Sequence, residues 1–311
     1  MLRETLEILD LLDDPAASGC KIRECILQYG AFDTAVRKVE GESRSTDFIR
    51  IVIPGAHGRS AGGEAPTLGI IGRLGGVGAR PQAVGFVSDG DGAAAALTAA
   101  LKLAKMSRRG DVLDGDVIVA TQICPFSPTE PHDPVPFMGS AVDMETMNRL
   151  EVDPRMEAIL SIDTTKGNRL LNRRGFAVTP TVREGYILRV SDDLLDLMQT
   201  VTGEAPAVFP ITQQDITPYA NRLYHVNSIL QPCTATASPV VGVAITAASM
   251  VPGCATGASH EGDIEQAARF AVETAKAFTR GKCRFCDETE WEKLLGLYGP
   301  LRRFQGTGAT V

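Results

Sequence analysis

The chain has 311 residues, of which 44% are hydrophobic and 22% are charged, and its net charge is −7. This composition is typical of a globular protein and excludes a disordered or fibrous chain. The acidic charge argues against a nucleic-acid partner, because nucleic-acid-binding proteins usually carry a basic face.

The N-terminal segment, about residues 1–30, predicts two helices that are separated at Asp14 and Pro15. Acidic residues interrupt its leucines, so it lacks the apolar core of a signal peptide. No later stretch approaches the roughly 20 apolar residues of a membrane span. Since the seven cysteines are scattered and no export signal is present, we expect reduced thiols, a cytoplasmic location and no membrane partner.

Strands and helices alternate along the rest of the chain. Strands are predicted at residues 48–54, 67–76, 82–88, 116–121, 158–162, 185–191, 207–212 and 238–247, and helices at residues 93–106, 192–203 and 264–278. Several of these strands are continuously apolar, which is typical of a parallel sheet that is covered on both faces. We therefore expect an α/β fold, a three-layer αβα sandwich with a mostly parallel mixed sheet, in one domain over residues 1–311.

Ligands bind to such sheets at the carboxyl ends of the strands. Four predicted loops meet there, at residues 89–91, 122–132, 163–168 and 254–263. The Pro-rich stretch at about residues 122–140 is long for a compact domain, so we interpret it as a functional insertion.

Three acids and one histidine in these loops are candidate site residues. Asp89 and Asp91 open a helix, where they could cap free N–H groups or bind a metal. Asp163 ends an apolar strand and needs a partner, which could be Lys166 or Arg169 in a salt bridge, or a metal or substrate. His260 precedes the last helix, either as a polar residue at the helix start or as a nitrogen ligand for zinc.

Cysteine and glycine patterns give weaker alternatives. Cys124 with His132, and Cys254 with His260, could form thiol–imidazole pairs for covalent catalysis, but cysteine is often buried and inert. The CxxC at residues 283–286 has no second CxxC or nearby histidine to complete a zinc knuckle. The runs GAHGRSAGG and GRLGGVGARP match no phosphate-loop pattern, so no nucleotide cofactor is expected.

Five runs resemble one known family over nearly the whole chain, the domain of unknown function 1177: GRLGGVGARP, SDGDGAAAAL, SIDTTKGNR, QDITPYANRLYHVNSILQP and VPGCATGAS. The order of motifs is more distantly similar to zinc-dependent aminopeptidases of the tetrahedral and glutamyl aminopeptidase type. That resemblance implies a zinc-peptidase-like fold around zinc or another divalent metal. It assigns Asp89 as the bridging carboxylate, Asp163 as the strand-end ligand and His260 as the final histidine.

Two motifs of those peptidases are missing from this chain. Arg73 and Gly75 stand in place of the His-x-Asp motif, and residues 122–123 in place of the Glu-Glu pair. Hydrolytic zinc sites need about three protein ligands, so Asp91 or His132 could complete the site as ligand or catalytic base. Alternatively, Arg73 occupies the vacated space and pairs with the site aspartates or with a substrate carboxylate.

Several functions are compatible with this resemblance. The first is metal-dependent hydrolysis of an amide in a small peptide or amino-acid derivative, with Arg73, Lys166, Cys124 and Cys254 as substrate contacts. The second is a degenerate peptidase-fold protein that binds a small anionic metabolite, and the third is a cysteine-dependent enzyme. The first two are compatible with a homo-oligomer whose other partner is a small molecule.

Overall fold

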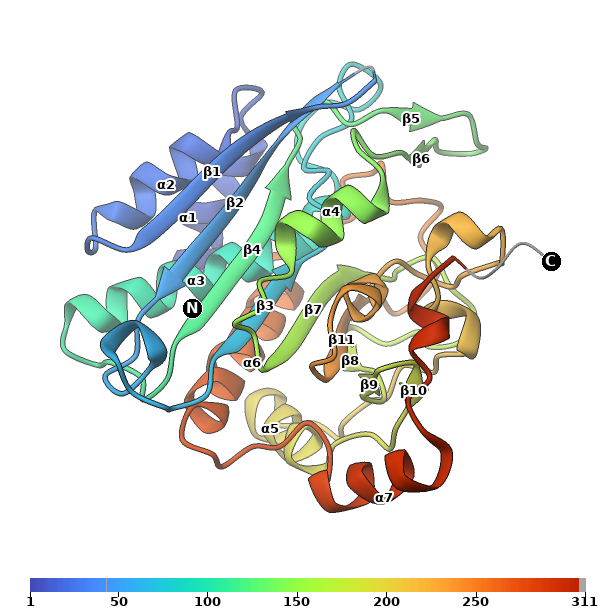
Figure 1. The fold of residues 1–311 in the computed structure, drawn as a ribbon. Coiled ribbons are helices and arrows are strands. Elements are labelled where there is room, and N and C mark those ends of the chain that lie inside the picture. Colours follow the sequence, from blue (N-terminus) through green and yellow to red (C-terminus); the bar gives the residue numbers. More distant parts are fainter. Residues whose placement is uncertain (43, 308–311) are drawn as a thin grey trace.

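The computed structural model describes residues 1–42 and 44–307, and its centre is a mixed β-sheet. In this part of the chain the sheet has nine strands, in the order β1-β2-β4-β3-β7-β11-β9-β10, with β8 paired to β11 (Figure 1). Its four central strands run parallel: β4 (Val117–Ile123), β3 (Leu68–Gly72), β7 (Ala158–Thr164) and β11 (Val240–Thr246). They are buried almost throughout, as expected for apolar strands that are covered on both faces.

The edges of the sheet are antiparallel. On one side β2 (Ser45–Ile53) pairs with β4, and β1 (Asp33–Glu40) pairs with β2. On the other side lie three short strands: β8 (Gly175–Val178), β9 (Val182–Arg183) and β10 (Tyr186–Ile187). The mixed sheet is therefore parallel at its centre, where the strand ends meet at one edge.

Helices cover both faces of the sheet unequally. On one face α3 (Asp91–Arg108) and α6 (Glu261–Phe278) pack directly on the strands, with α1 (Leu2–Asp13) over them. Around these lie α2 (Gly19–Leu27), against β1 and β2, and α5 (Asp192–Thr202), against α6. On the other face Figure 1 shows α4 (Met144–Glu151), while α7 (Glu288–Tyr298) lies beyond the short strands. The expected three-layer αβα sandwich is confirmed.

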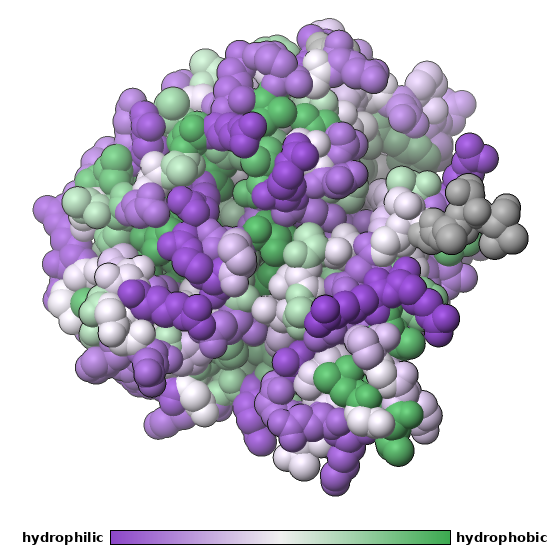
Figure 2. Space-filling view, in the orientation of Figure 1, coloured by the Kyte–Doolittle hydropathy of each residue, from purple (hydrophilic) through white to green (hydrophobic). Residues whose placement is uncertain are grey.

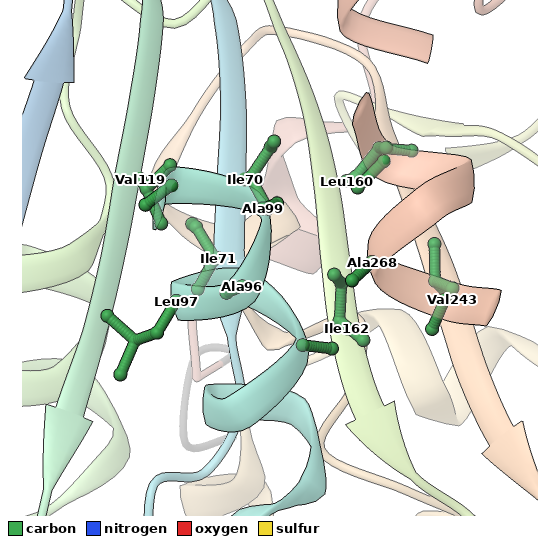
Figure 3. Close-up of a cluster of buried hydrophobic side chains, with 14 of the residues drawn as sticks. Ile70, Ile71, Ala96, Leu97, Ala99, Val119, Leu160, Ile162, Val243 and Ala268 are labelled. Carbon is green, nitrogen blue, oxygen red and sulfur yellow. The ribbon is translucent and has the colours of Figure 1, made fainter. Parts of the chain in front are cut away.

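Small side chains let α3 approach the sheet closely. Figure 3 shows Ala96 and Ala99 of this helix beside Ile70 and Ile71 of β3. Almost every residue of α3 from 91 to 104 is buried, because the helix lies between the sheet and α1. Alanine suits this position because it favours a helix and takes little space.

Two predicted strands are absent for local reasons. Residues 82–88 form turns and loop, because Gly85 has a φ of 87° and the Phe86 N–H donates to Asp13 Oδ1 (2.5 Å) instead of to a strand. Residues 207–212 make only an isolated bridge between Val208 and Val178. Pro210 has no N–H to donate to a ladder there. The sequence patterns also missed β1, β8, α4 and α7.

The surface is mixed in character. Figure 2 shows hydrophilic side chains over much of one face, with hydrophobic residues in separate groups, one of them over α7, where Leu297 is exposed. None of the helices within residues 1–42 and 44–307 is long and apolar enough to cross a membrane.

Candidate functional site

The end of β3 and the start of α3 touch through two glycines. A Cβ on Gly92 would lie 2.2 Å from the Arg73 carbonyl oxygen and 2.3 Å from that of Ile162. A Cβ on Gly72 would lie 2.7 Å from the Ala93 Cα. Because backbone meets backbone here, only glycine fits both positions. This contact brings the start of α3 to the carboxyl ends of β3 and β7.

We expect Gly92→Ala to lower the free energy of unfolding by about 1–3 kcal/mol, because the added methyl group must push two backbone carbonyls apart. Urea unfolding of the full chain measures the effect. Gly257→Ala is the matched control, since a Cβ there meets nothing within 4 Å. Equal stability of the two variants would show that the start of α3 is looser than described.

Asp89 and Asp163 line one cavity of about 810 Å³ at the carboxyl edge of the sheet. Both are almost completely buried, with exposed fractions of 4% and 2%. The Ser228 hydroxyl donates to Asp163 Oδ2 (2.6 Å), and the Thr164 N–H donates to Oδ1 (2.8 Å). Asp89 interacts with the Cys254 thiol and with the backbone of Gly76. Each carboxylate is therefore held in place from a different loop.

The two carboxylates destabilise each other's charged form. Burial raises the pKa of Asp89 to about 8, and the nearby Asp163 carboxylate acts in the same direction. Burial also raises the pKa of Asp163 to about 6, against the hydrogen bonds from Ser228 and Thr164. Two buried acids thus face one cavity without a matched positive charge from the ion pairs of the described chain.

Lys166 is part of the cavity wall and forms a separate buried ion pair with Asp91, which is not part of the wall. The Lys166 ammonium donates to Asp91 and to the Ala258 carbonyl (2.7 Å), and the Ser259 hydroxyl donates to Asp91 (2.5 Å). Of the alternatives for Asp163, the salt bridge to Lys166 does not form, because Lys166 is paired with Asp91 instead. This pair joins the loop after β7 to the start of α3, and the bonds to Ala258 and Ser259 add the loop before α6.

Arg73 lies in the core and not on the cavity wall. Its side chain has no exposed surface, its Nε lies 2.9 Å from Glu151 Oε2, and it donates to Asn148. The alternative in which Arg73 pairs with Asp89 and Asp163 is therefore not observed, because α4 supplies Glu151 as its partner. The Arg73 charge still lowers the pKa of Asp163, against the larger effect of burial. Burial raises the pKa of Glu151 to about 7, and Arg73 opposes this.

The two candidate histidines lie on the surface. His260 is exposed at the N-cap of α6 and its side chain does not cap the helix. His132 is at the rim of the cavity, where the Pro-rich loop folds into the hairpin of β5 (Thr129–Glu130) and β6 (Phe137–Met138). Its ring lies 3.8 Å from that of Phe137.

The predicted metal ligands are only partly brought together. Asp89 and Asp163 share the cavity, but His260 is not part of its wall. Among the residues that the structure describes, no group of three or more His, Cys, Asp and Glu side chains could hold a metal ion. The start of α3 also lacks the predicted side-chain cap, since its N-cap is Gly90 and neither aspartate caps it.

The candidate thiols are engaged by oxygen atoms. The Cys124 thiol is buried and donates to the Ser45 carbonyl (3.5 Å), while Cys254 interacts with Asp89. Burial raises the pKa of both Cys124 and Cys254. The predicted pairing of Cys124 with His132 is therefore not formed.

Two further cavity residues, Tyr219 and Ser228, were not singled out in the sequence. Burial raises the pKa of Tyr219, the Asp163 charge adds to this, and a hydrogen bond with Ser228 opposes it. Both residues lie in the run QDITPYANRLYHVNSILQP, which carries part of the family resemblance. This run was the only indication in the sequence that Tyr219 and Ser228 could be site residues, because it shows no helix or strand periodicity.

One protein-family model matches most of the chain. The family model described as "Protein of unknown function (DUF1177)" matches residues 37–308. No curated protein sequence matches the chain.

Two solved structures are similar over most of the chain. One is "Bottromycin maturation enzyme BotP in complex with Mn", with a TM-score of 0.51 and 14% identity, covering 89% of this chain and 70% of that one. The other is the LapA aminopeptidase of Legionella pneumophila, with a TM-score of 0.50 and 12% identity, covering 92% of this chain and 72% of that one. At these identities the similarity establishes the fold, which is that of the peptidases expected from the motif order.

Proposed function

The chain belongs to the DUF1177 family, and we propose that it is a metal-dependent hydrolase of the amidase or peptidase type, acting on a small peptide or amino-acid derivative. The observation that carries the proposal is the pair of buried carboxylates, Asp89 and Asp163, in one cavity. Bringing two such acids together without a matched cation costs free energy, and arrangements of this kind are concentrated at functional sites. The fold shared with a manganese-bound enzyme and an aminopeptidase supports the same chemistry.

The available donors suit a hard divalent cation better than zinc. Two carboxylates, with waters completing the coordination, are a common way for proteins to hold Mg²⁺ or Mn²⁺. A zinc site with three protein ligands does not fit, because His260 is exposed and outside the cavity wall. When bound, a cation of this kind supplies Lewis acidity toward an amide carbonyl.

The surrounding residues have distinct supporting roles in this proposal. Ser228 and Thr164 orient Asp163, and Cys254 orients Asp89. The Lys166–Asp91 pair fixes the loops from which these groups come. The hairpin with His132 stands at the cavity rim, where it limits access of water to the bound amide.

Elemental analysis of the purified chain after incubation with Mn²⁺ and removal of free metal tests the proposal. We expect about one ion per chain, lost in Asp89→Asn because the amide removes one of two charged ligands. Asp111→Asn, at an exposed acid outside the cavity, is the matched control and should retain the ion. Equal metal content in both variants, or none in the unmodified chain, would contradict the assignment.

A metabolite-binding role for Arg73 is not supported by its surroundings. The guanidinium has no exposed surface and is already engaged by Glu151 and Asn148, so it has no free edge for a substrate carboxylate. Self-association and a cytoplasmic location stay predictions.

A cysteine-dependent enzyme would have a reactive thiol, whereas we expect both candidate thiols, Cys124 and Cys254, to react slowly. Since burial raises the pKa of Cys124 and Cys254, little thiolate forms at neutral pH and both should react slowly with iodoacetamide. The exposed Cys20 should be labelled first and serves as the internal control. Mass spectrometry of peptides over time checks the order, and rapid labelling of Cys254 with loss of activity would favour a cysteine enzyme.

A further inference from the structure

A second cavity of about 1000 Å³ adjoins the one that contains the carboxylates. It lies between α4, the end of β6, the turns near residues 218–235 and residues 305–307. Much of its wall is apolar, formed in part by Leu74, Met138, Val142, Met144 and Met147. A wall with three methionines is adaptable, because these side chains are flexible and polarizable.

Three residues form the boundary between the two cavities: Leu74, Met138 and Tyr219. A Cβ on Gly76 would lie 2.4 Å from Asp89 Oδ2 and 2.9 Å from the Met138 methyl carbon, so both atoms border the same small space. Tyr219 interacts with Ser228, which in turn donates to Asp163. Each carboxylate is thus connected to the second cavity by one boundary residue.

The buried polar groups in this wall and behind it already have partners within the protein. Arg73 is paired with Glu151, and Asn148 donates to the Thr234 hydroxyl (3.0 Å). The Gln122 amide contacts the Met147 sulfur (3.4 Å) from behind. The charged residues of α4 and of its N-cap that line this cavity, Asp143, Glu145 and Arg149, are exposed. The interior therefore favours an uncharged, apolar occupant.

We propose that the methionine-lined cavity binds an apolar side chain of the substrate, of leucine size or larger, next to the reacting amide. The inference rests on the proposed function for the position of that amide, between Asp89 and Asp163. A group attached to the amide there reaches the second cavity past Met138 or Tyr219. Burying additional methylene groups in such a wall favours larger apolar side chains.

Calorimetric titration with the amides of leucine, phenylalanine, alanine and glutamate tests binding, and ammonia release from the same compounds tests hydrolysis separately. We expect leucinamide to bind at least about tenfold more tightly than alaninamide, and the α-amide of glutamate to bind most weakly.

Val142→Glu places a charge in the wall and should remove this preference, whereas the matched variant Val142→Leu should keep it. Ala220→Trp, at an exposed position of the same wall, should weaken phenylalaninamide more than alaninamide.

The outcomes separate this inference from the proposed function. A side-chain preference that is lost in Val142→Glu supports the cavity assignment even if no amide is hydrolysed, in which case only the hydrolase proposal falls. Hydrolysis of all four amides at similar efficiency overturns the cavity assignment and leaves the hydrolase proposal standing. Unchanged binding in both Val142→Glu and Ala220→Trp also overturns it.

Discussion

Asp163→Asn is expected to lower kcat for amide hydrolysis by about 10²–10⁴-fold, because the proposed reaction depends on the negative charge at this position. Asparagine preserves the shape of the side chain. Its carbonyl oxygen can accept the Thr164 N–H, and its NH₂ group can donate to the Ser228 hydroxyl, which accepts as well as donates. The loss therefore reports on charge and not on a collapsed cavity. Steady-state rates on leucinamide, with and without added Mn²⁺, measure it.

The same substitution should leave the melting temperature unchanged or raise it when no metal is added. In the unmodified chain Asp163 is buried beside Asp89, and the amide removes the free-energy cost of burying the charge of Asp163 next to a second acid. A gain in stability with a loss of function is the pattern expected of a group that is retained for function.

Asp215→Asn is the matched control for a buried acid that does not line this cavity. Asp215 is 1% exposed and accepts from the Thr212 hydroxyl (3.0 Å) and N–H (2.8 Å) and from the Val226 N–H (2.6 Å). An amide in its place cannot keep all these bonds, so this variant should lose about 1–3 kcal/mol of stability and retain its kcat. If Asp163→Asn behaved like this control, the role assigned to Asp163 would be wrong.

The centre of the fold could be predicted from the sequence because its signals are local. Continuous apolar runs fixed the four parallel strands, and the alanine-rich run fixed α3. The errors fell where local signals conflicted. Residues 82–88 have a strand-like composition, but Gly85 at positive φ and the contact of Phe86 with Asp13 give a loop. The edge strand β1 alternates between exposed and half-buried residues, so its apolar signal was weak.

The candidate site could be predicted only where a strand end determines position. Asp163 follows from topology, because it lies in β7 at the carboxyl edge of the central strands. Asp89 was expected after a strand at residues 82–88 that does not form, and it reaches the cavity because the start of α3 packs against the end of β3. His260 also follows a strand, but a long loop separates it from β11, and side-chain direction in a loop has no period. Arg73 found its partner, Glu151, on a helix that the patterns did not predict. The methionine-lined cavity was missed for the same reason, since α4 forms one of its walls.

The pair of Arg73 and Glu151 should contribute the largest stability effect of any ion pair in the described chain. Both side chains are 0% exposed, with Nε and Oε2 2.9 Å apart. We expect Glu151→Leu to lower the free energy of unfolding by about 3–5 kcal/mol, because it leaves a guanidinium buried without a counter-charge. Guanidinium chloride unfolding at neutral pH measures the change.

Arg73→Met should cost less than Glu151→Leu, although both remove the same interaction. Arginine cannot lose its proton in a protein, whereas a carboxyl group can take one up. Burial already raises the pKa of Glu151 to about 7, so without Arg73 this group can become neutral. An uncompensated buried charge is therefore avoided in Arg73→Met but not in Glu151→Leu.

The double variant Arg73→Met/Glu151→Leu should recover much of the loss, because no buried charge remains and an apolar pair can fill the space. Glu40→Leu in the exposed pair Lys38–Glu40, whose side chains are 62% and 72% exposed, is the matched control and should change stability by less than about 1 kcal/mol. If the stability losses of the two single variants add up in the double variant, the pair stabilises the protein by packing under α4 and not by charge compensation. Recovery of stability would instead show that charge pairing explains how the core accommodates an arginine at the end of β3, next to the proposed cation site.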